Sequence, residues 1–445
     1  MKTTVVGAGL VGSLWAIYLA KRGYQVTLYE RRPDMRKVSM DAGRSINLAL
    51  SDRGLKALNA VGLEDDIRAM AIPMHGRMVH GQDGAINFQP YGLQGQFINS
   101  ISRGGLNQLL MDKAELAGAY IHFGQRGQDV DLQNNVLLME DGTKVASELL
   151  FGTDGAFSAI RTAMTKTDRF NYSQTYLEHG YKELSIPPTT DGGWQLEKNA
   201  LHIWPRKSFM LIALPNLDGS FTCTLFLALE GSVSFAQLTD AENAVAFFET
   251  YFPDALALMP HFKVEFFQNP TSSLATFRCY PWSMGGRALL LGDAAHGIVP
   301  FYGQGMNAGF EDCTVLNLLM DEYGEDWSQI MPAFEKRRKP DTDAIAELAL
   351  RNFIEMRDSV ADERYLLRRK IEQAMQQQHP EEFLPLYSMV SFSHIPYSQA
   401  LHRGQAYDQF FQSKPLEELR SVEQKLGTLE GNDLLDGWFK QLQAL

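Results

Sequence analysis

The chain has 445 residues, more than a single hydrophobic core usually supports, which predicts two or three compact domains. Hydrophobic residues make up 45% and charged residues 21%, the usage of an ordinary globular protein rather than a disordered one. The formal net charge is −12 and no stripe of Lys or Arg occurs, which excludes nucleic acid as the expected partner.

The three cysteines, Cys223, Cys279 and Cys313, are far apart and lack CxxC spacing. This argues against a disulfide framework, and no metal site is expected. Met1 leads directly into an apolar strand without the regions of a secretory signal. The sequence has no uninterrupted apolar stretch of about 18 residues, so no membrane anchor is expected. We therefore expect a cytoplasmic protein, with the oligomeric state open and a homodimer among the alternatives.

The first thirty residues predict a strand, a glycine-rich turn, a helix and a second strand, the start of a βαβ unit. In the turn, GAGLVG, the first glycine allows a tight turn, the second lets the backbone approach a pyrophosphate, and the third permits close helix–strand packing. The helix N-terminus favours phosphate, and the acidic residue ending the second strand can accept ribose hydroxyls. The motif does not separate FAD from NAD. The predicted dinucleotide contacts are Gly7, Gly9, Leu10, Val11, Gly12 and Glu30.

Two later segments repeat a strand followed by a turn, and we expect both strands to join the first sheet. Glu148–Gly155 reads ELLFGTDG, and its Asp154–Gly155 turn resembles the Asp-Gly motif of flavoprotein hydroxylases, which serves both FAD and the nicotinamide cofactor. Arg287–Asp293 reads RALLLGD. Between them, Asn199–Leu229 is rich in aromatic and β-branched residues and predicts an antiparallel sheet in an inserted domain.

The stretch GDAAHGIVPFYGQGMN ends a strand with an aspartate, passes a proline and several glycines, and enters an apolar helix. Asp293 can bond a ribityl hydroxyl, and the helix-opening amides can approach the electron-rich end of an isoalloxazine. A purely structural connection is the alternative. The predicted flavin contacts here are Asp293, Gly303, Gly305, Met306 and Asn307.

From Trp327 onward Glu, Lys, Arg, Gln, Ala and Leu dominate at helical spacing, with Pro340, Pro380 and Pro385 expected to break the helices. The predicted fold class is α/β: a Rossmann-like FAD-binding domain with an inserted antiparallel-sheet substrate domain and a helical C-terminal region. We expect residues 1–70, 100–175 and 275–326 in the FAD-binding domain, 71–99 and 176–274 in the substrate domain, and 327–445 in the helical region.

Taken together and in this order, the three motifs resemble those of single-component FAD monooxygenases. No second GxGxxG follows for NADPH, as in these hydroxylases, whose nicotinamide cofactor docks transiently. Five further segments are similar to the kynurenine 3-monooxygenase family, over nearly the whole chain up to about residue 403. They are Gly43–Gly54, Ile72–His80, Leu201–Arg206, Phe221–Phe226 and Phe301–Cys313. Membrane-anchored members of that family carry a hydrophobic C-terminal helix that this sequence lacks.

The resemblance implies particular site residues. Arg77 and Tyr91 would hold the substrate carboxylate, Asn352 and Tyr387 would complete the substrate pocket, and Arg103 would contact FAD. Without the resemblance, Arg77 reads as a surface arginine and Tyr387 as a core aromatic. An apolar roof over the flavin is expected from the middle domain, including His202, Trp204, Phe221 and Phe226.

The resemblance also implies the reaction, a step of tryptophan degradation by the kynurenine pathway toward NAD biosynthesis. NADPH reduces FAD, O2 forms a flavin hydroperoxide, and L-kynurenine becomes 3-hydroxy-L-kynurenine. The aniline activates its own ring, so no catalytic side chain is assigned. The protein is expected to exclude water and to orient the ring.

Other function classes are weighed against this reading. The nearest is an FAD monooxygenase that acts on another aromatic acid. A flavin halogenase is disfavoured because no GWxWxIP segment occurs, and a hydrolase because no GxSxG elbow occurs. His75 and His80 lack metal-ligand spacing and are expected at the surface or in loops. A catalytically idle flavoprotein that binds a partner in a redox-dependent way is the remaining alternative, and turnover would exclude it.

Overall fold

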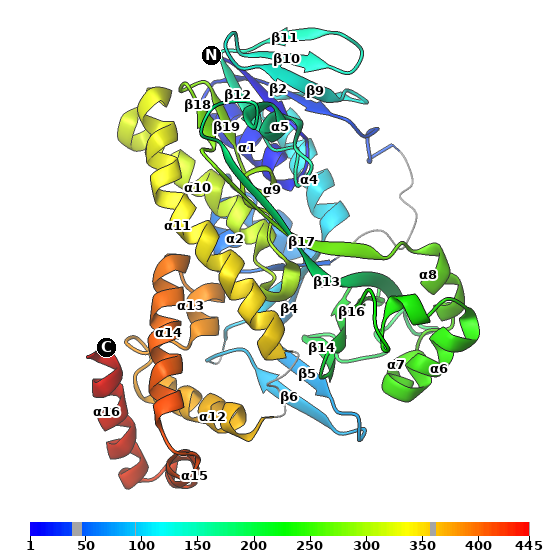
Figure 1. Cartoon of the computed structure of the whole chain (residues 1–445), viewed down its shortest axis with the longest axis vertical. Helices are drawn as coiled ribbons and strands as arrows, with labels where there is room; N and C mark the ends of the chain where they lie inside the picture. The colour runs from blue at the N-terminus through cyan, green and yellow to red at the C-terminus, as the bar shows by residue number, and fades with distance from the viewer. Residues whose placement is uncertain (38–46, 94, 357–361, 445) are drawn as a thin grey trace.

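The computed structural model describes residues 1–37, 47–93, 95–356 and 362–444. Residues 43–46 of the GRSINLALSDRG segment therefore lie outside the described residues. The chain forms two large sheets, two small sheets and a C-terminal set of helices (Figure 1).

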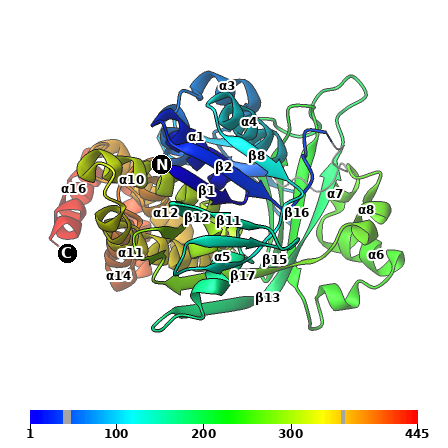
Figure 2. The ribbon, with the colours of Figure 1, turned by 90° about the horizontal axis from the view of Figure 1, so that it is seen from above.

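The six-stranded sheet near the N-terminus has the strand order β18-β19-β12-β1-β2-β8. β1 pairs in parallel with β2 and β12, and β12 pairs in parallel with β19. The three segments expected to share one sheet do so, which confirms that prediction. Helix α1 packs against both α4 and α10 beside this sheet (Figures 1 and 2). The elements are β1 (Lys2–Val6), α1 (Leu10–Lys21), β2 (Gln25–Glu30), α4 (Arg103–Leu116), β8 (Tyr120–Phe123), β12 (Leu149–Gly152), β18 (Ser283–Met284), β19 (Ala288–Leu290) and α10 (Gly305–Tyr323).

The seven-stranded sheet has the order β17-β13-β16-β15-β14-β5-β6. The pairs from β14 to β16 are antiparallel, as predicted for the middle of the chain, and β5 joins β14 in parallel. Helices α6, α7 and α8 lie on the side of this sheet away from the six-stranded sheet (Figure 1). The elements are β5 (Gly76–His80), β6 (Ile86–Pro90), β13 (Asn171–Ile186), β14 (Ala200–Arg206), β15 (Phe209–Pro215), β16 (Phe221–Ala228), α6 (Ala241–Tyr251), α7 (Pro253–Leu256), α8 (Phe262–Gln268) and β17 (Ser272–Tyr280).

Two small sheets and several short helices connect these layers. One small sheet has the order β3-β7-β4, and the other has the order β11-β10-β9. The elements are β3 (Asn47–Leu50), α2 (Asp52–Asn59), α3 (Glu64–Met70), β4 (Ala71–Met74), β7 (Ile98–Ser102), β9 (Gly127–Asp131), β10 (Val136–Met139), β11 (Lys144–Ala146), α5 (Ala159–Met164), α9 (Asp293–His296) and two 3₁₀ turns, η1 (Phe235–Gln237) and η2 (Pro300–Tyr302).

The C-terminal region is helical, as predicted, and its buried aromatic and aliphatic side chains form one core together with side chains of the seven-stranded sheet and of the segment around η2. The helices are α11 (Trp327–Ile354), α12 (Glu363–Gln378), α13 (Leu386–Ser391), α14 (Tyr397–Ser413), α15 (Leu416–Lys425) and α16 (Leu429–Gln443). Pro380 and Pro385 lie between helices, as expected. Among the residues described, no helix has both the length and the apolar character needed to cross a membrane.

The predicted break at Pro340 is wrong, because α11 continues through it. Proline inside a helix removes one backbone hydrogen bond and costs about 3 kcal/mol. Neighbouring side chains fix both sides of the turn: the buried Arg338 donates to Asp312 Oδ1 at 2.8 Å, and Asp341 accepts from the Ser398 N–H at 3.0 Å. These tertiary contacts hold the helix on its course despite the local cost.

Candidate active site

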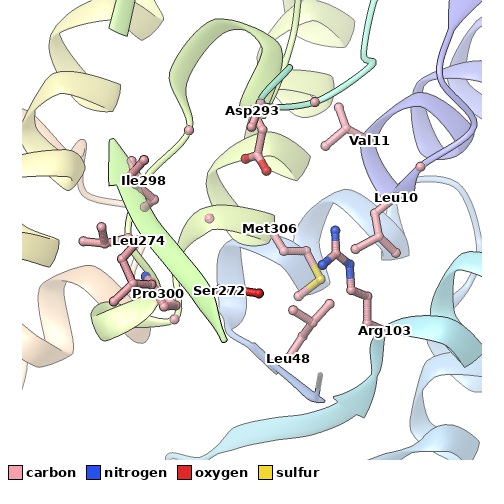
Figure 3. A pocket seen from close by; sticks show the side chains of 18 of the residues that line it. Leu10, Val11, Leu48, Arg103, Ser272, Leu274, Asp293, Ile298, Pro300 and Met306 are labelled. Carbon is pink, nitrogen blue, oxygen red and sulfur yellow. The ribbon is translucent and has the colours of Figure 1, made fainter. Parts of the chain in front are cut away.

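A cavity of about 1160 Å³ lies between the six-stranded and seven-stranded sheets. Its lining comes from the turn between β1 and α1, the ends of β2 and β12, the segment around α9 and η2, and the inner face of the second sheet. Figure 3 shows a close view with Leu10, Arg103, Asp293 and Met306 pointing into it. The volume exceeds the roughly 300–1,000 Å³ of a typical single-ligand pocket, so a cofactor and a substrate can share it.

The glycines of the first turn serve different physical purposes. Gly7 has φ +98°, and a Cβ there would lie 2.7 Å from Thr153 O. A Cβ on Gly12 would lie 2.0 Å from Gly7 O, so this position brings the helix close to the strand and does not line the cavity. A Cβ on Gly9 would meet no protein atom within 4 Å, and Gly9 lines the cavity together with Gly7, Leu10 and Val11. The open side of the turn is therefore free for a pyrophosphate to approach.

Glu30 lies at the end of β2 and lines the same end of the cavity. Its Oε2 accepts from the Ala8 N–H at 3.0 Å, and its Oε1 accepts from Arg32 Nε at 2.8 Å. Although burial disfavours the charge, these hydrogen bonds and the nearby guanidinium hold the pKa of Glu30 below its ordinary value. The carboxylate is charged at neutral pH and fits the role of a ribose acceptor.

Asp154, which lines the cavity beside the first turn, keeps one acceptor atom unpartnered. Its Oδ2 accepts from the Ala159 N–H at 2.7 Å, whereas its Oδ1 is buried without a hydrogen-bond partner among the residues described. Burial raises the pKa of Asp154. A buried acceptor without a partner is costly, and a hydroxyl or amide of a bound cofactor would relieve that cost.

The segment that opens α10 approaches the middle of the cavity. Gly303, Gly305 and Met306 line it, and Gly303 has φ +68° in the turn before the helix. The Asn307 side chain does not line the cavity: its Nδ2 donates to Ala49 O and Gly303 O at 2.8 Å each. Asn307 thus fixes the turn from behind, and the predicted contact of its backbone amide with flavin stays a prediction.

The far end of the cavity gathers a cation and three tyrosines. The Arg77 guanidinium carbon lies 4.9 Å from the Tyr387 ring centroid and 5.5 Å from that of Tyr91. Tyr387 stacks between Tyr91 and Tyr302, with centroid distances of 5.3 and 5.5 Å. Arg77 is half-buried rather than exposed: its Nε is buried and has no hydrogen-bond partner in the part of the chain that the structure describes. Burial raises the pKa of Tyr91, so this hydroxyl stays protonated and able to donate.

Asn352 does not line the cavity. Its Nδ2 donates to Phe301 O at 2.7 Å, and Phe301 in turn lies in the lining, 5.0 Å from the Phe226 ring centroid and stacked on Phe353 at 4.2 Å. Asn352 therefore acts on the cavity through Phe301 in this structure, and direct contact with a substrate stays a prediction.

The expected aromatic roof is wrong for three of its four side chains. Phe226 lines the cavity, but Trp204 and Phe221 belong to the core under α6 and α8 on the other side of the sheet. His202 is buried on that same side, whereas its neighbour Leu201 lines the cavity. Successive strand residues alternate between faces, so a run of aromatics cannot all face one side.

His80 is also placed differently from the expectation, whereas His75 is exposed as predicted. His80 is 2% exposed, with Nδ1 3.0 Å from Asp254 Oδ2 and Nε2 2.9 Å from His202 Nδ1. Burial disfavours the charge of Asp254, but hydrogen bonds from His80 and Trp204 lower its pKa to about 2. These side chains come from segments 122 and 174 residues from His80, so no local spacing signals the contact.

Residues 1–349 match the family model described as an FAD binding domain. A kynurenine 3-monooxygenase from Flavobacterium johnsoniae is 50% identical over 95% of this chain and 94% of its own length. One from Myxococcus xanthus is 53% identical over 91% and 89%.

The chain belongs to the kynurenine 3-monooxygenase family. Another relative with that name, from Legionella pneumophila, is 43% identical over 90% of both chains. The family membership and the FAD-type match make FAD the cofactor and the chain an FAD-dependent aromatic monooxygenase.

Solved structures agree in fold. 2-Methyl-3-hydroxypyridine-5-carboxylic acid oxygenase covers 80% of this chain and 93% of its own, with a TM-score of 0.67 and 20% identity. The tetracycline destructase Tet(51) matches with a TM-score of 0.60 over 82% of this chain and 93% of its own, at 19% identity. Both share the Rossmann-like domain with its inserted sheet, which confirms the predicted fold class.

Proposed function

We propose that the chain converts L-kynurenine to 3-hydroxy-L-kynurenine, with FAD as cofactor and NADPH and O2 as co-substrates. The observation that carries the proposal is the half-buried Arg77 guanidinium at the end of a cavity that begins at a dinucleotide turn. Its Nε is buried and has no hydrogen-bond partner among the described residues. A buried charge needs a partner of opposite sign, and a free amino-acid substrate brings a carboxylate. The relatives described above carry the name kynurenine 3-monooxygenase, which supports kynurenine as the substrate.

The residues that would hold FAD are those whose geometry fits it. The open face at Gly9 and the α1 N-terminus would take the pyrophosphate, and Glu30 the ribose. Asp293 lies exposed to the cavity and would accept from the ribityl chain, with Arg103 near the opposite wall (Figure 3). When bound, FAD supplies the two-electron reduction and the oxygen activation that no side chain can supply.

The chain's own residues then bind and orient the substrate. Arg77 would pair the carboxylate, and the protonated hydroxyl of Tyr91 would donate to it. Apolar side chains, among them Phe226 and Met210, would pack on the ring and exclude water. The aniline nitrogen activates the ring carbon next to it, so the protein needs to place that carbon rather than to remove a proton with a strong base.

The purified protein tests the proposal directly. We expect a yellow protein that releases FAD on denaturation, L-kynurenine-stimulated NADPH oxidation, and 3-hydroxykynurenine as product. Anthranilate and 4-hydroxybenzoate serve as comparison acids. Hydroxylation of one of these with no turnover of kynurenine would replace the proposed substrate, and absence of any turnover by FAD-loaded protein would overturn the enzymatic proposal.

Two further parts of the proposal concern setting and organisation. A cytoplasmic location is supported by three buried free thiols, which need no oxidising compartment. We also propose three domains and a homodimer. The FAD-binding domain comprises residues 1–70, 100–175 and 275–326, the substrate domain residues 71–99 and 176–274, and the helical region residues 327–445. Limited proteolysis and light scattering test these two points.

A further inference from the structure

Arg53 is a buried cation on α2 that the proposed reaction does not use directly. Its side chain is only 1% exposed. Burying a guanidinium is costly unless its donors are hydrogen-bonded and its charge is paired. The contacts that meet this cost reach two different parts of the molecule.

On one side, Arg53 binds the carboxyl end of α13. Its Nε donates to Val390 O at 3.1 Å and its Nη2 to Met389 O at 3.4 Å, and Nη2 also donates to Ile395 O in the segment between α13 and α14. The guanidinium also lies 4.0 Å from the ring centroid of Tyr397, at the start of α14. The last carbonyls of a helix lack internal partners and form its negative end, so a cation placed there fixes the helix.

Helix α13 carries Tyr387, one of the rings packed around Arg77. The helix is only six residues long, too short to hold its place by its own hydrogen bonds. The position of the Tyr387 ring between Tyr91 and Tyr302 therefore depends on what anchors α13. Arg53 donates two hydrogen bonds to α13 itself and a third to Ile395, in the segment that follows it.

On the other side, Arg53 belongs to a chain of buried ion pairs that reaches the FAD site. Its Nη1 donates to Glu311 Oε1 at 2.6 Å, and Glu311 Oε2 accepts from Arg338 at 2.6 Å. Burial disfavours the charge of Glu311, but the two guanidinium groups hold its pKa below the ordinary value. Asp312, which pairs with Arg338, also accepts from the Gly292 N–H at 3.0 Å, directly before Asp293.

We propose that Arg53 is a positioning residue for the carboxylate end of the substrate site. It holds α13, and with it Tyr387, at a fixed distance from the FAD-binding elements. The part of this inference that names kynurenine rests on the function proposed above. Without the contacts of Arg53, which we call the clamp, α13 samples other positions. The apparent affinity for the substrate then falls in proportion to the fraction of molecules whose site is assembled.

The first experiment compares ligands by titrating the flavin spectrum. Arg53→Met should raise the Kd of L-kynurenine about tenfold, if the assembled fraction falls to roughly a tenth. Arg53→Lys keeps the charge without the fork of donors and should recover part of the loss. The ring-only ligand 2-aminoacetophenone lacks the amino-acid carboxylate, so its Kd should change by less than about twofold. An equal loss for both ligands would mean general disruption and would overturn the positioning role.

Arg22→Met is the matched control. Arg22 also donates to a backbone carbonyl and a carboxylate, Asn317 O and Asp321, but these lie on the later part of α10. This variant should bind L-kynurenine as the wild type does. A similar loss of affinity in Arg22→Met would show that any buried or half-buried arginine matters equally, which contradicts the inference.

The second experiment needs no substrate. Amide hydrogen exchange should accelerate in residues 386–391 of Arg53→Met and Arg53→Lys, while α16 keeps the wild-type rate. Unchanged exchange in residues 386–391 would overturn the proposal even if kynurenine is the substrate. Faster exchange there in a protein that does not turn over kynurenine would retain the clamp and reject the proposed function.

Discussion

In the proposed function, recognition of the amino-acid substrate depends most on Arg77. Its buried Nε has no hydrogen-bond partner among the described residues, and the rest of the guanidinium lies beside the Tyr387 and Tyr91 rings, with a hydrogen bond to the Tyr91 side chain. Removing one member of a desolvated charge pair costs about 2–5 kcal/mol, which corresponds to roughly 30-fold or more in affinity. Arg77→Met should therefore weaken kynurenine binding at least that much while FAD content is retained.

Tyr91→Phe is the companion variant, because it removes one neutral hydroxyl and should cost about tenfold or less. Arg77→Lys should recover only part of the loss, since one ammonium cannot reproduce the planar fork. Titration of kynurenine against the flavin spectrum measures all three. Binding by Arg77→Met within about twofold of wild type would place the carboxylate elsewhere.

Glu183 gives a prediction about pH. It lies on β13 opposite Thr224, and Thr224 lines the cavity. Burial raises the pKa of Glu183 to about 7, with Arg103 opposing the shift. A carboxyl group with a raised folded-state pKa contributes stability below its ordinary pKa, and this contribution is lost as pH rises through the folded value. The contribution to the free energy of unfolding should therefore fall between about pH 4.5 and 7.

Glu183→Gln removes this titration. The difference in unfolding free energy between pH 5 and pH 8, measured by denaturant on FAD-free protein, should be smaller in the variant than in the wild type. Glu178→Gln, an exposed change on the same strand, is the control and should leave the pH dependence as it is. An identical pH dependence in Glu183→Gln and wild type would rule out a titration of Glu183 in this range.

At the scale of elements, two glycines between β1 and α1 have different roles: Gly12 allows the helix to pack on the strand, and Gly9 leaves room for the cofactor. A Cβ on Gly12 would collide with the backbone of Gly7, whereas one on Gly9 would enter open space. Gly12→Ala should destabilise even the FAD-free protein by about 1–3 kcal/mol, because backbone must move. Gly9→Val should cost the FAD-free protein less stability than Gly12→Ala yet deplete bound FAD, because its side chain points into open space that the pyrophosphate would occupy.

Denaturant unfolding of FAD-free protein and the flavin absorbance of protein as purified measure the two effects. The control is Gly437→Ala on α16, where a Cβ would meet no atom within 4 Å. Gly118→Ala would not serve, because Gly118 has φ +100° and the substitution would strain the backbone. Full FAD occupancy in Gly9→Val would contradict the assignment of the first turn to the pyrophosphate.

Elements defined by local pattern could be predicted, and contacts between distant segments could not. The GAGLVG turn carries its own chemistry in six residues, so its strand and helix follow from sequence. The helix through Pro340 and the burial of His80 depend on partners far along the chain, such as Asp312 and Asp254. Arg77 is an example of the second kind. The sequence of β5 does not indicate which of its side chains face a cavity, and only the family resemblance pointed to Arg77.

At the scale of the whole molecule, three parts of the chain meet around one cavity. Asp293 comes from the first sheet region, Phe226 from the second sheet, and Tyr387 from the C-terminal helices. Under the proposed function, productive turnover requires all three to enclose the substrate, because oxygen activated by bound FAD would be released as hydrogen peroxide if the substrate ring were not in place. We expect wild type to form close to one 3-hydroxykynurenine per NADPH consumed.

Tyr387→Ala should open the end of the cavity formed by the C-terminal helices. The loss of its stacking contacts should raise the KM for kynurenine about threefold to tenfold. More NADPH should then be consumed per product formed, with the difference recovered as hydrogen peroxide, because water reaches the flavin. Tyr407→Ala is the matched control: Tyr407 is buried among the same helices, stacked on Phe383 at 5.2 Å, but does not line the cavity. Peroxide equal in the two variants would mean that looser helices, rather than the missing ring, cause the leak, and unchanged coupling in Tyr387→Ala would remove the C-terminal region from the enclosure of the substrate.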